Sequence, residues 1–167
     1  CLARLSSMGS AWQGSRQVRG NLVQEGLRMA GSLATQSKLG LLSGSPENVS
    51  EAVAATLAFP DVLRVEVLKT DGGKLLAKGV LPKGEADKPT LISAASREAY
   101  LESESDDAWR FVAPVWSTRQ ETPFDVVAPT DELLGHAVVV MSKSTLTKMV
   151  ANIFLVNILS SFFFAAV

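Results

Sequence analysis

The chain has 167 residues, enough for one domain with helical extensions, and its net charge is −1 with 47% hydrophobic and 20% charged residues. This composition is typical of a folded protein and excludes a disordered chain. The near-neutral charge offers no basic surface to a polyanion, so we expect no nucleic-acid partner. The one cysteine, Cys1, excludes an intramolecular disulfide and a cysteine-based metal site.

A long helix is predicted over Ala11–Leu42, where apolar residues recur at helical spacing and no proline interrupts them. The interior glycines Gly20, Gly26 and Gly31 each cost roughly 1 kcal/mol relative to alanine, so the helix needs a packing partner. Glycine also permits close helix approach, which fits a dimer interface and packing on the chain's own domain equally well. Because the apolar stripe is wider than one small sheet requires, we expect a parallel homodimer through Leu22, Met29 and Leu33.

The hydrophobic period changes to two after Pro60, which predicts strands. Just before it, Ser45-Pro46-Glu47 predicts the start of a second helix, with serine as the cap and proline at the first helical position. A strand with one buried face is expected over Asp61–Lys69. A tight turn at Thr70–Gly73 and a returning strand over Lys74–Gly79 complete a hairpin.

The next part of the chain is predicted to alternate between helix and strand. Thr90–Glu104 is expected to hold a short helix that crosses the sheet. The acidic residues at its end lack the ligand spacing of a calcium loop and are expected in a solvated loop: Glu102, Glu104, Asp106 and Asp107. Strands are expected over Ala108–Trp116 and Leu133–Ser142, and Phe124–Val127 could extend their hairpin. Antiparallel strands with helices on one side make an α+β domain.

The last stretch, Met149–Val167, carries no Asp, Glu, Lys or Arg over its 19 residues. A membrane-spanning helix needs about 20 mostly apolar residues, so this stretch predicts one, with Ser144 or Thr145 as its cap. A buried core helix or an amphipathic partner helix is the competing interpretation. The three phenylalanines at 162–164 argue against it, because they make the helix apolar on every side.

Three segments carry a family resemblance: Pro60–Leu68 with the turn at Asp71-Gly72, Trp109–Val115, and Leu134–Val140. They resemble the first hairpin, the central strand and the last strand of PAS-like sensor domains of the CHASE and Cache type. Such domains form the extracytoplasmic input of bacterial histidine kinases, diguanylate cyclases and chemoreceptors. The resemblance implies a PAS-like sheet, a periplasmic domain on the inner membrane, a homodimer, and control of a cytoplasmic output through helix movement. A membrane-anchored structural or adaptor domain without signalling output is the alternative.

On this basis the chain divides into three parts. Residues 1–44 form a helix expected to dimerise and to continue from an upstream membrane helix, residues 45–145 form the sensor domain, and residues 146–167 start the C-terminal membrane helix. No nucleophile elbow, phosphate loop or multi-histidine metal set occurs in the sequence. We therefore expect no catalysis, cofactor or metal in this chain.

A small molecule or a periplasmic protein is the expected ligand. In PAS-like domains the ligand cavity lies between the sheet and the connection that crosses it, and such cavities are apolar with few convergent polar groups. The residues predicted to line it are Arg64, Tyr100, Trp109, Arg110, Phe111 and His136. The competing interpretation is that the aromatic side chains fill the core, the histidine is structural and both arginines face water. It follows from strand alternation, which places Arg110 on the opposite face from Trp109 and Phe111.

Overall fold

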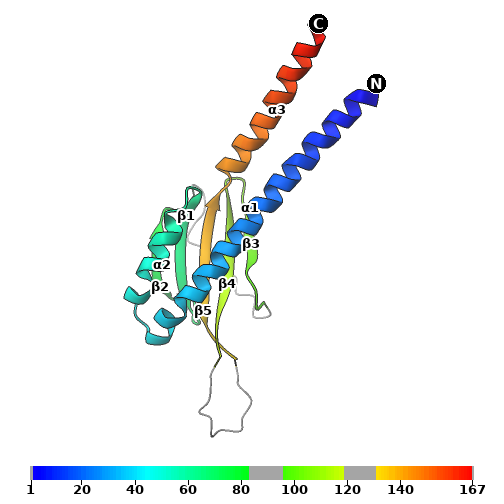
Figure 1. The fold of residues 1–167 in the computed structure, drawn as a ribbon. Helices are drawn as coiled ribbons and strands as arrows, with labels where there is room; N and C mark the ends of the chain where they lie inside the picture. Colours follow the sequence, from blue (N-terminus) through cyan, green and yellow to red (C-terminus); the bar gives the residue numbers. More distant parts are fainter. Residues whose placement is uncertain (1, 83–95, 119–130, 167) are drawn as a thin grey trace.

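The chain folds as an α+β protein around one five-stranded antiparallel sheet (Figure 1). The computed structural model describes residues 2–82, 96–118 and 131–166. The strands lie in the order β2-β1-β5-β4-β3, with the bounds β1 Val62–Lys69, β2 Lys74–Gly79, β3 Tyr100–Glu104, β4 Ala108–Thr118 and β5 Asp131–Ser142. The helices are α1 Leu2–Ser43, α2 Glu47–Leu57 and α3 Ser144–Ala165. The α+β class, the antiparallel sheet and the long N-terminal helix expected from the sequence are confirmed.

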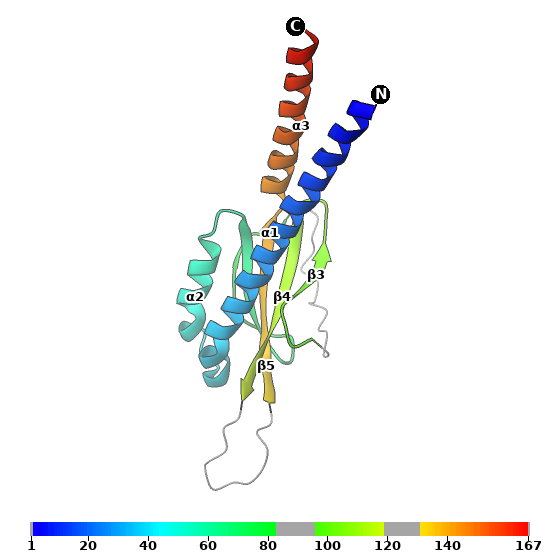
Figure 2. The same cartoon turned by 45° about the vertical axis from the view of Figure 1, so that its right-hand side comes forward.

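Helices α1 and α2 cover the same face of the sheet, which we call the helix-covered face (Figures 1 and 2). α1 packs mainly on β4 and β5, whereas α2 packs on β1 and β2. The main hydrophobic core lies between these helices and the sheet, and its largest fully buried side chains are Trp109, Phe111 and Leu33. The second half of α1 therefore contributes to the same core as the segment after residue 44.

Two glycines of α1 serve packing within the chain. A Cβ atom at Gly26 would collide with the ring of Phe111, and one at Gly40 would collide with the side chain of Val49. Gly20 and Gly31, in contrast, have open space within 4 Å of the position a Cβ would take. Of the two roles that the sequence left open for helix glycines, close packing on the chain's own domain is the one that Gly26 and Gly40 fulfil.

The hairpin of β1 and β2 has the turn predicted from the sequence, and its bounds differ from the prediction only in that β1 begins at Val62 and not at Asp61. Gly72 takes a φ of 85°, and its N–H donates to the carbonyl oxygen of Lys69 at 3.0 Å. The N–H of Gly73 donates to the Asp71 carboxylate at 2.8 Å. A positive φ suits glycine because an L side chain is strained there.

The expectation of a single buried face on β1 is wrong. Val65 and Val67 are buried on the helix-covered face at 0% exposure, but Glu66 and Leu68 on the other face are 1% and 3% exposed. A second cluster of buried residues, to which Leu68 belongs, lies on this other face of the sheet. We call it the outer face.

Strand β3 replaces the end of the expected crossing helix. Residues 96–99 are not helical, and Tyr100–Glu104 pairs antiparallel with β4; residues 90–95 and the segment Phe124–Val127 lie outside the described residues. β4 and β5 lie where strands were predicted, with bounds a few residues longer. The middle strand of the sheet is β5, while β4 is its inner neighbour.

Neither side-chain cap predicted from the sequence is present. α2 begins after Pro46 and α3 begins after Lys143, in both cases without a side-chain cap hydrogen bond. The hydroxyl of Thr145 instead donates to the carboxylate of Asp61 at 2.6 Å. This contact ties the start of α3 to the residue that precedes β1.

The two terminal helices leave the same end of the sheet, and both chain ends lie on that side of the molecule (Figures 1 and 2). α3 has 22 residues; its most apolar stretch has a mean hydropathy of 1.6, and none of that stretch is buried inside the structure. At 1.5 Å per residue it spans about 33 Å, which matches the hydrocarbon thickness of a bilayer. By length and composition α3 can therefore cross a membrane.

Candidate functional site

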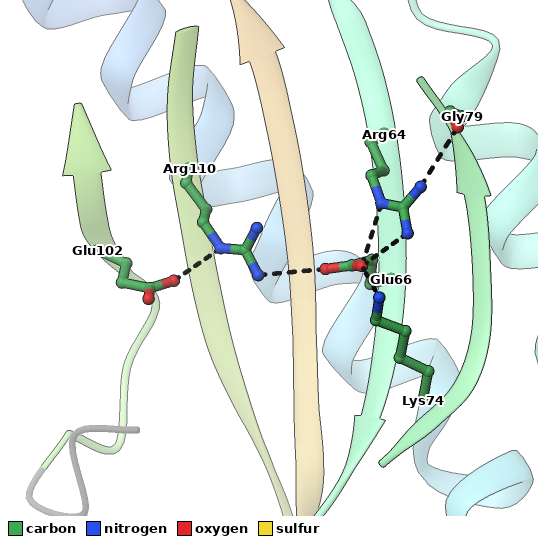
Figure 3. Close-up of polar contacts among 6 residues, drawn as sticks. All are labelled: Arg64, Glu66, Lys74, Gly79, Glu102 and Arg110. Atoms are coloured by element: carbon green, nitrogen blue, oxygen red, sulfur yellow. Dashed lines mark hydrogen bonds and ion pairs between the residues drawn. The ribbon is translucent and has the colours of Figure 1, made fainter. Parts of the chain in front are cut away.

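The outer face of the sheet carries a cluster of charged side chains in a mostly buried setting (Figure 3). It consists of Arg64 and Glu66 on β1, Lys74 on β2, Glu102 on β3 and Arg110 on β4, and we call it the charged cluster. The side chain of Glu66 is 1% exposed, and those of Arg110 and Arg64 are 11% and 15% exposed. Charged groups are buried at this level only when they are paired.

Glu66 is the centre of the charged cluster. Nε and Nη2 of Arg64 both lie 3.0 Å from its Oε1. Nη2 of Arg110 donates to its Oε2 at 3.2 Å, and Nζ of Lys74 lies 3.5 Å from its Oε1. Arg110 also uses Nε to donate to Oε2 of Glu102 at 2.9 Å. One buried carboxylate thus faces three cations, and a second carboxylate holds the far side of Arg110.

The strand register explains why these side chains meet. Arg64 on β1 and Arg110 on β4 both pair with Val140 on β5, from its two sides, while Glu66 pairs with the next residue on that face, Val138. Antiparallel partners share a face, so the long side chains of Arg110 and Glu66 meet across β5 (Figure 3). Both valines are 0% exposed.

His136 lies on the same face of β5, two residues before Val138, and is 1% exposed. Burial lowers its pKa below the usual 6.5, and the nearby carboxylate of Glu102 opposes this effect only in part. The ring is therefore neutral near pH 7. Its Nδ1 atom is buried and has no hydrogen-bond partner among the described residues.

The structure brings together four of the six residues predicted to line a ligand site. Arg64, Arg110 and His136 lie on the outer face, and Tyr100 packs beside them against the buried residues of that face. Trp109 and Phe111 lie on the helix-covered face at 0% exposure and fill the core, as the competing interpretation held. The other part of that interpretation, that both arginines face water, is wrong because both bind Glu66.

Sequence reasoning missed Glu66, Lys74 and the role of Glu102. A signal for Glu66 was present, because a glutamate between Val65 and Val67 with an arginine two residues earlier predicts a same-face ion pair on a strand. Glu102 was expected in a solvated loop. It belongs instead to β3, and its side chain is 7% exposed against Arg110.

Glu104 was also expected in the solvated loop, and it too belongs to β3. Its carboxylate accepts from Nη2 of Arg19 on α1 at 2.6 Å and from Nζ of Lys143 at 2.7 Å. Lys143 above all, with a smaller effect from Arg19, lowers its pKa from 4.5 to about 2. Asp106 and Asp107 are exposed, as expected.

The three residues expected at a dimer interface have neighbours within the chain. Met29 and Leu33 are 8% and 1% exposed in the main core, and Leu22 is partly buried against it. Their apolar side chains are thus occupied by the chain's own sheet. The homodimer stays a prediction.

None of the six residues predicted for a ligand site lines either of the hollows described next, which are bordered by described residues. One of about 320 Å³ lies between α1 and the end of β4, beside Arg97 and Trp116. The other, of about 450 Å³, lies beside the start of α3 and includes Lys148 and Asp106. The charged cluster is therefore the strongest candidate for a functional site, because it gathers four interacting strands around one buried carboxylate.

Comparison with known proteins assigns no function to this site. No family model matches the chain, and no curated protein or solved structure matches it. Within residues 2–82, 96–118 and 131–166, no group of His, Cys, Asp and Glu side chains is placed to hold a metal ion. The interpretation of the site depends on its geometry and on the position of the terminal helices.

Proposed function

We propose that this chain is the extracytoplasmic input domain of a transmembrane signalling protein, with a PAS-like sheet outside the inner membrane and α3 entering it. The observation that carries the proposal is the exit of α1 and α3 from the same end of the sheet, with α3 apolar and unburied (Figures 1 and 2). A domain joined to a membrane at one end by two neighbouring helices transmits a conformational change as relative movement of those helices.

The order of the strands supports the PAS-like part of the proposal. The first hairpin lies at one edge of the sheet, β4 is an inner strand, and β5 leads through Lys143 directly into α3. These positions agree with those that the resemblance implies for the three segments, with one exception. The resemblance implies that β4 is the central strand, whereas the central strand is β5.

We propose the charged cluster as the part that responds to a signal, and a small anion as the ligand. A carboxylate or phosphate group that reached Arg64 or Arg110 would compete with Glu66 for the same guanidinium groups, whose planar donors suit bidentate recognition. If the bound anion replaces Glu66 as the partner of an arginine, the side-chain contacts that join β1 to β4 change. Signal binding would in this way alter the sheet without a preformed empty cavity.

A chimeric sensor kinase tests the proposed function. This chain replaces the periplasmic domain and second membrane helix of a two-helix kinase, and kinase output is compared between the wild-type chain and Glu66→Gln. We expect Glu66→Gln to change the output, because it removes the carboxylate that holds both arginines, and Glu51→Gln on the exposed side of α2 to leave it unchanged. Unchanged output in both variants, with normal insertion and expression, contradicts a sensory role.

A membrane-anchored structural or adaptor domain is the second candidate. The observation that favours it is the pairing of Glu66 within the chain, since three cations already surround this carboxylate. A cluster of this kind can specify the arrangement of the strands without binding any ligand. The chimeric kinase separates the two functions, because an adaptor domain leaves its output unaffected.

A further inference from the structure

Strand β3 contacts both the charged cluster and the two terminal helices. Glu102 accepts a hydrogen bond from Arg110 in the charged cluster at 2.9 Å. Two residues later, Glu104 binds Arg19 of α1 at 2.6 Å and Lys143, the residue directly before α3, at 2.7 Å. We call Arg19, Glu104 and Lys143 the clasp.

An irregularity in the strand pairing places the two glutamates on opposite faces. Residues two apart on a regular strand share a face. The register of β3 on β4 shifts between Leu101 and Ser103, so that Ser103 lies opposite Arg110 and Glu104 lies opposite Trp109. Glu104 thus lies toward the helix-covered face, while Glu102 points to Arg110 on the outer face (Figure 3).

The clasp holds the start of α3 in a defined position. Nζ of Lys143 lies 5.4 Å from the centre of the Trp109 ring in addition to its bond with Glu104. The backbone N–H of Lys143 donates to the carbonyl oxygen of Asp107, in the turn between β3 and β4, at 2.8 Å. The first residue before α3 is therefore attached to β3 and to the turn that follows it.

The position of β3 in the sheet makes it suited to move. It forms the edge, and within the described residues it pairs with β4 alone, whereas β4 and β5 each pair on both sides. A shift of an edge strand breaks one set of backbone hydrogen bonds, and a shift of an inner strand breaks two. Edge displacement is thus the least costly rearrangement that reaches both faces.

We propose that β3 is a coupling strand, in which a change of the Glu102–Arg110 contact displaces β3 and Glu104 transfers the displacement to Arg19 and Lys143. The relative position of α1 and α3 then depends on the state of the charged cluster. The use of this coupling in signalling rests on the proposed function, but the coupling itself is a property of the chain. It requires that the contacts of Glu102 and those of Glu104 share one conformational equilibrium.

Pulsed electron paramagnetic resonance on the full chain in lipid nanodiscs tests the proposal. Spin labels are attached through cysteines at Gln17 on α1 and Ala151 on α3, both exposed, after Cys1→Ser. Wild type and the control Glu51→Gln should give the same single distance distribution. Glu104→Gln and Glu102→Gln should each add a second distance population above about 10%, more than a minor state normally holds.

The decisive variant is Glu102→Gln, because its side chain contacts Arg110 in the charged cluster on the outer face, whereas Glu104 forms the contacts of the clasp. A distribution identical to wild type in this variant, or in Glu104→Gln, overturns the coupling strand. If Glu102→Gln does not fold, Arg110→Lys replaces it and should give the same second population. The distance measurement does not depend on signalling output, so the two proposals can fail separately. If the chimeric kinase responds but the distances do not change, only the proposed coupling by β3 is contradicted. If the distances change but the chimeric kinase does not respond, only the proposed sensory role is contradicted.

Discussion

Glu66 and Glu104 are held by cations in two different settings, and the difference decides their energetic roles. Glu66 is 1% exposed among three cations, so loss of its charge leaves guanidinium groups uncompensated in a mostly buried site. The side chain of Glu104 is 33% exposed, so water screens its two ion pairs. The first carboxylate therefore stabilises the fold more strongly than the second.

The first prediction concerns Glu66→Gln. We expect this variant to lower the free energy of unfolding by about 3 kcal/mol, because removal of the central carboxylate takes from Arg64, Lys74 and Arg110 the buried negative charge that they share. Denaturant unfolding of the full chain in detergent, followed by tryptophan fluorescence, measures it. The control Glu51→Gln, on an exposed part of α2, should change stability by less than about 0.5 kcal/mol. Equal effects of the two variants would mean that the charged cluster adds no stability.

The second prediction concerns the pH dependence of the clasp. The folded pKa of Glu104, about 2, lies below its unfolded value of 4.5, so its stabilising contribution is complete above the unfolded value. The contribution falls as the pH drops from 4.5 toward 2, where the carboxylate becomes protonated in the folded state as well. Near pH 7, Glu104→Gln should lower the free energy of unfolding by about 1 kcal/mol, the upper end for a partly exposed pair.

Unfolding curves of wild type and Glu104→Gln at several pH values measure this dependence. The gap between their free energies of unfolding should narrow steadily below pH 4.5. A gap that stays constant down to pH 2.5 would show that Glu104 acts through packing and not through its charge. The same comparison in a Lys143→Met background tests the cause, because Lys143 is the main reason for the low pKa of Glu104. In that background Glu104→Gln should change the free energy of unfolding by less than it does in the wild-type chain, already near pH 7.

At the scale of elements, α1 shows how one sequence pattern serves several neighbours. Its apolar side chains fill the core over β4 and β5, and two of its glycines let it lie close to Phe111 and Val49. The wide apolar stripe that suggested a dimer is accounted for in part by this contact with the sheet. The tolerance of α1 to added methyl groups should therefore differ sharply from one glycine to the next.

The third prediction compares the same substitution at two positions of α1. Gly26→Ala should destabilise the protein by about 2 kcal/mol, because the new methyl group would collide with the fully buried ring of Phe111. Gly31→Ala should stabilise it by about 0.5 to 1 kcal/mol, since open space surrounds that position and alanine favours the helix. Thermal or denaturant unfolding of both variants gives the signs. Two changes of the same sign would contradict the packing of α1 on β4.

The elements that could be predicted from the sequence are those with a strong local period. The first hairpin has alternating apolar residues and an Asp-Gly turn, and it was predicted nearly to its bounds. The helical stripe of α1 predicted its end to within one residue, but the helix begins at Leu2, nine residues before the predicted start at Ala11. β3 was missed because four of its five residues, Tyr100–Glu104, carry charged or hydroxyl side chains and the strand is only partly buried. The sequence of this edge strand shows no alternation of buried and exposed residues. β3 is a strand because it pairs with β4.

The charged cluster could be predicted only in part for a similar reason. Alternation separated Arg110 from Trp109 and Phe111 correctly, because that depends on β4 alone. The meeting of Arg110 with Glu66 depends on the register of two strands against β5, and these residues are 44 positions apart in the chain. No local pattern contains that information, so the arginines were expected to face water or a ligand.

At the scale of the whole molecule, the sheet places the start of α3 beside α1. β5 runs toward the end of the sheet at which α1 enters, and the clasp joins that end of β5 to α1 and β3. Beyond Leu146 in the first turn, which packs against the main core, most of the large apolar side chains of α3 that the structure describes are exposed; Phe154, Leu155 and Phe163, for example, are 54%, 55% and 74% exposed. An apolar helix of this length whose side chains are exposed over most of its turns requires either lipid or another protein around it.

The fourth prediction decides between these surroundings with two lysine substitutions in α3. Leu155→Lys places a charge near the middle of the helix, where insertion into a bilayer costs about 2.5 to 3.5 kcal/mol. Thr147→Lys places the same charge in the first turn, where a long side chain reaches the headgroups at little cost. If α3 spans a membrane, the fraction of chain that resists alkaline carbonate extraction should fall clearly for Leu155→Lys and stay at the wild-type level for Thr147→Lys. A helix that docks on a protein partner would be released by carbonate even without substitution. Full extraction of the wild-type chain would therefore contradict the membrane assignment, and with it the route by which α1 and α3 are proposed to carry a signal.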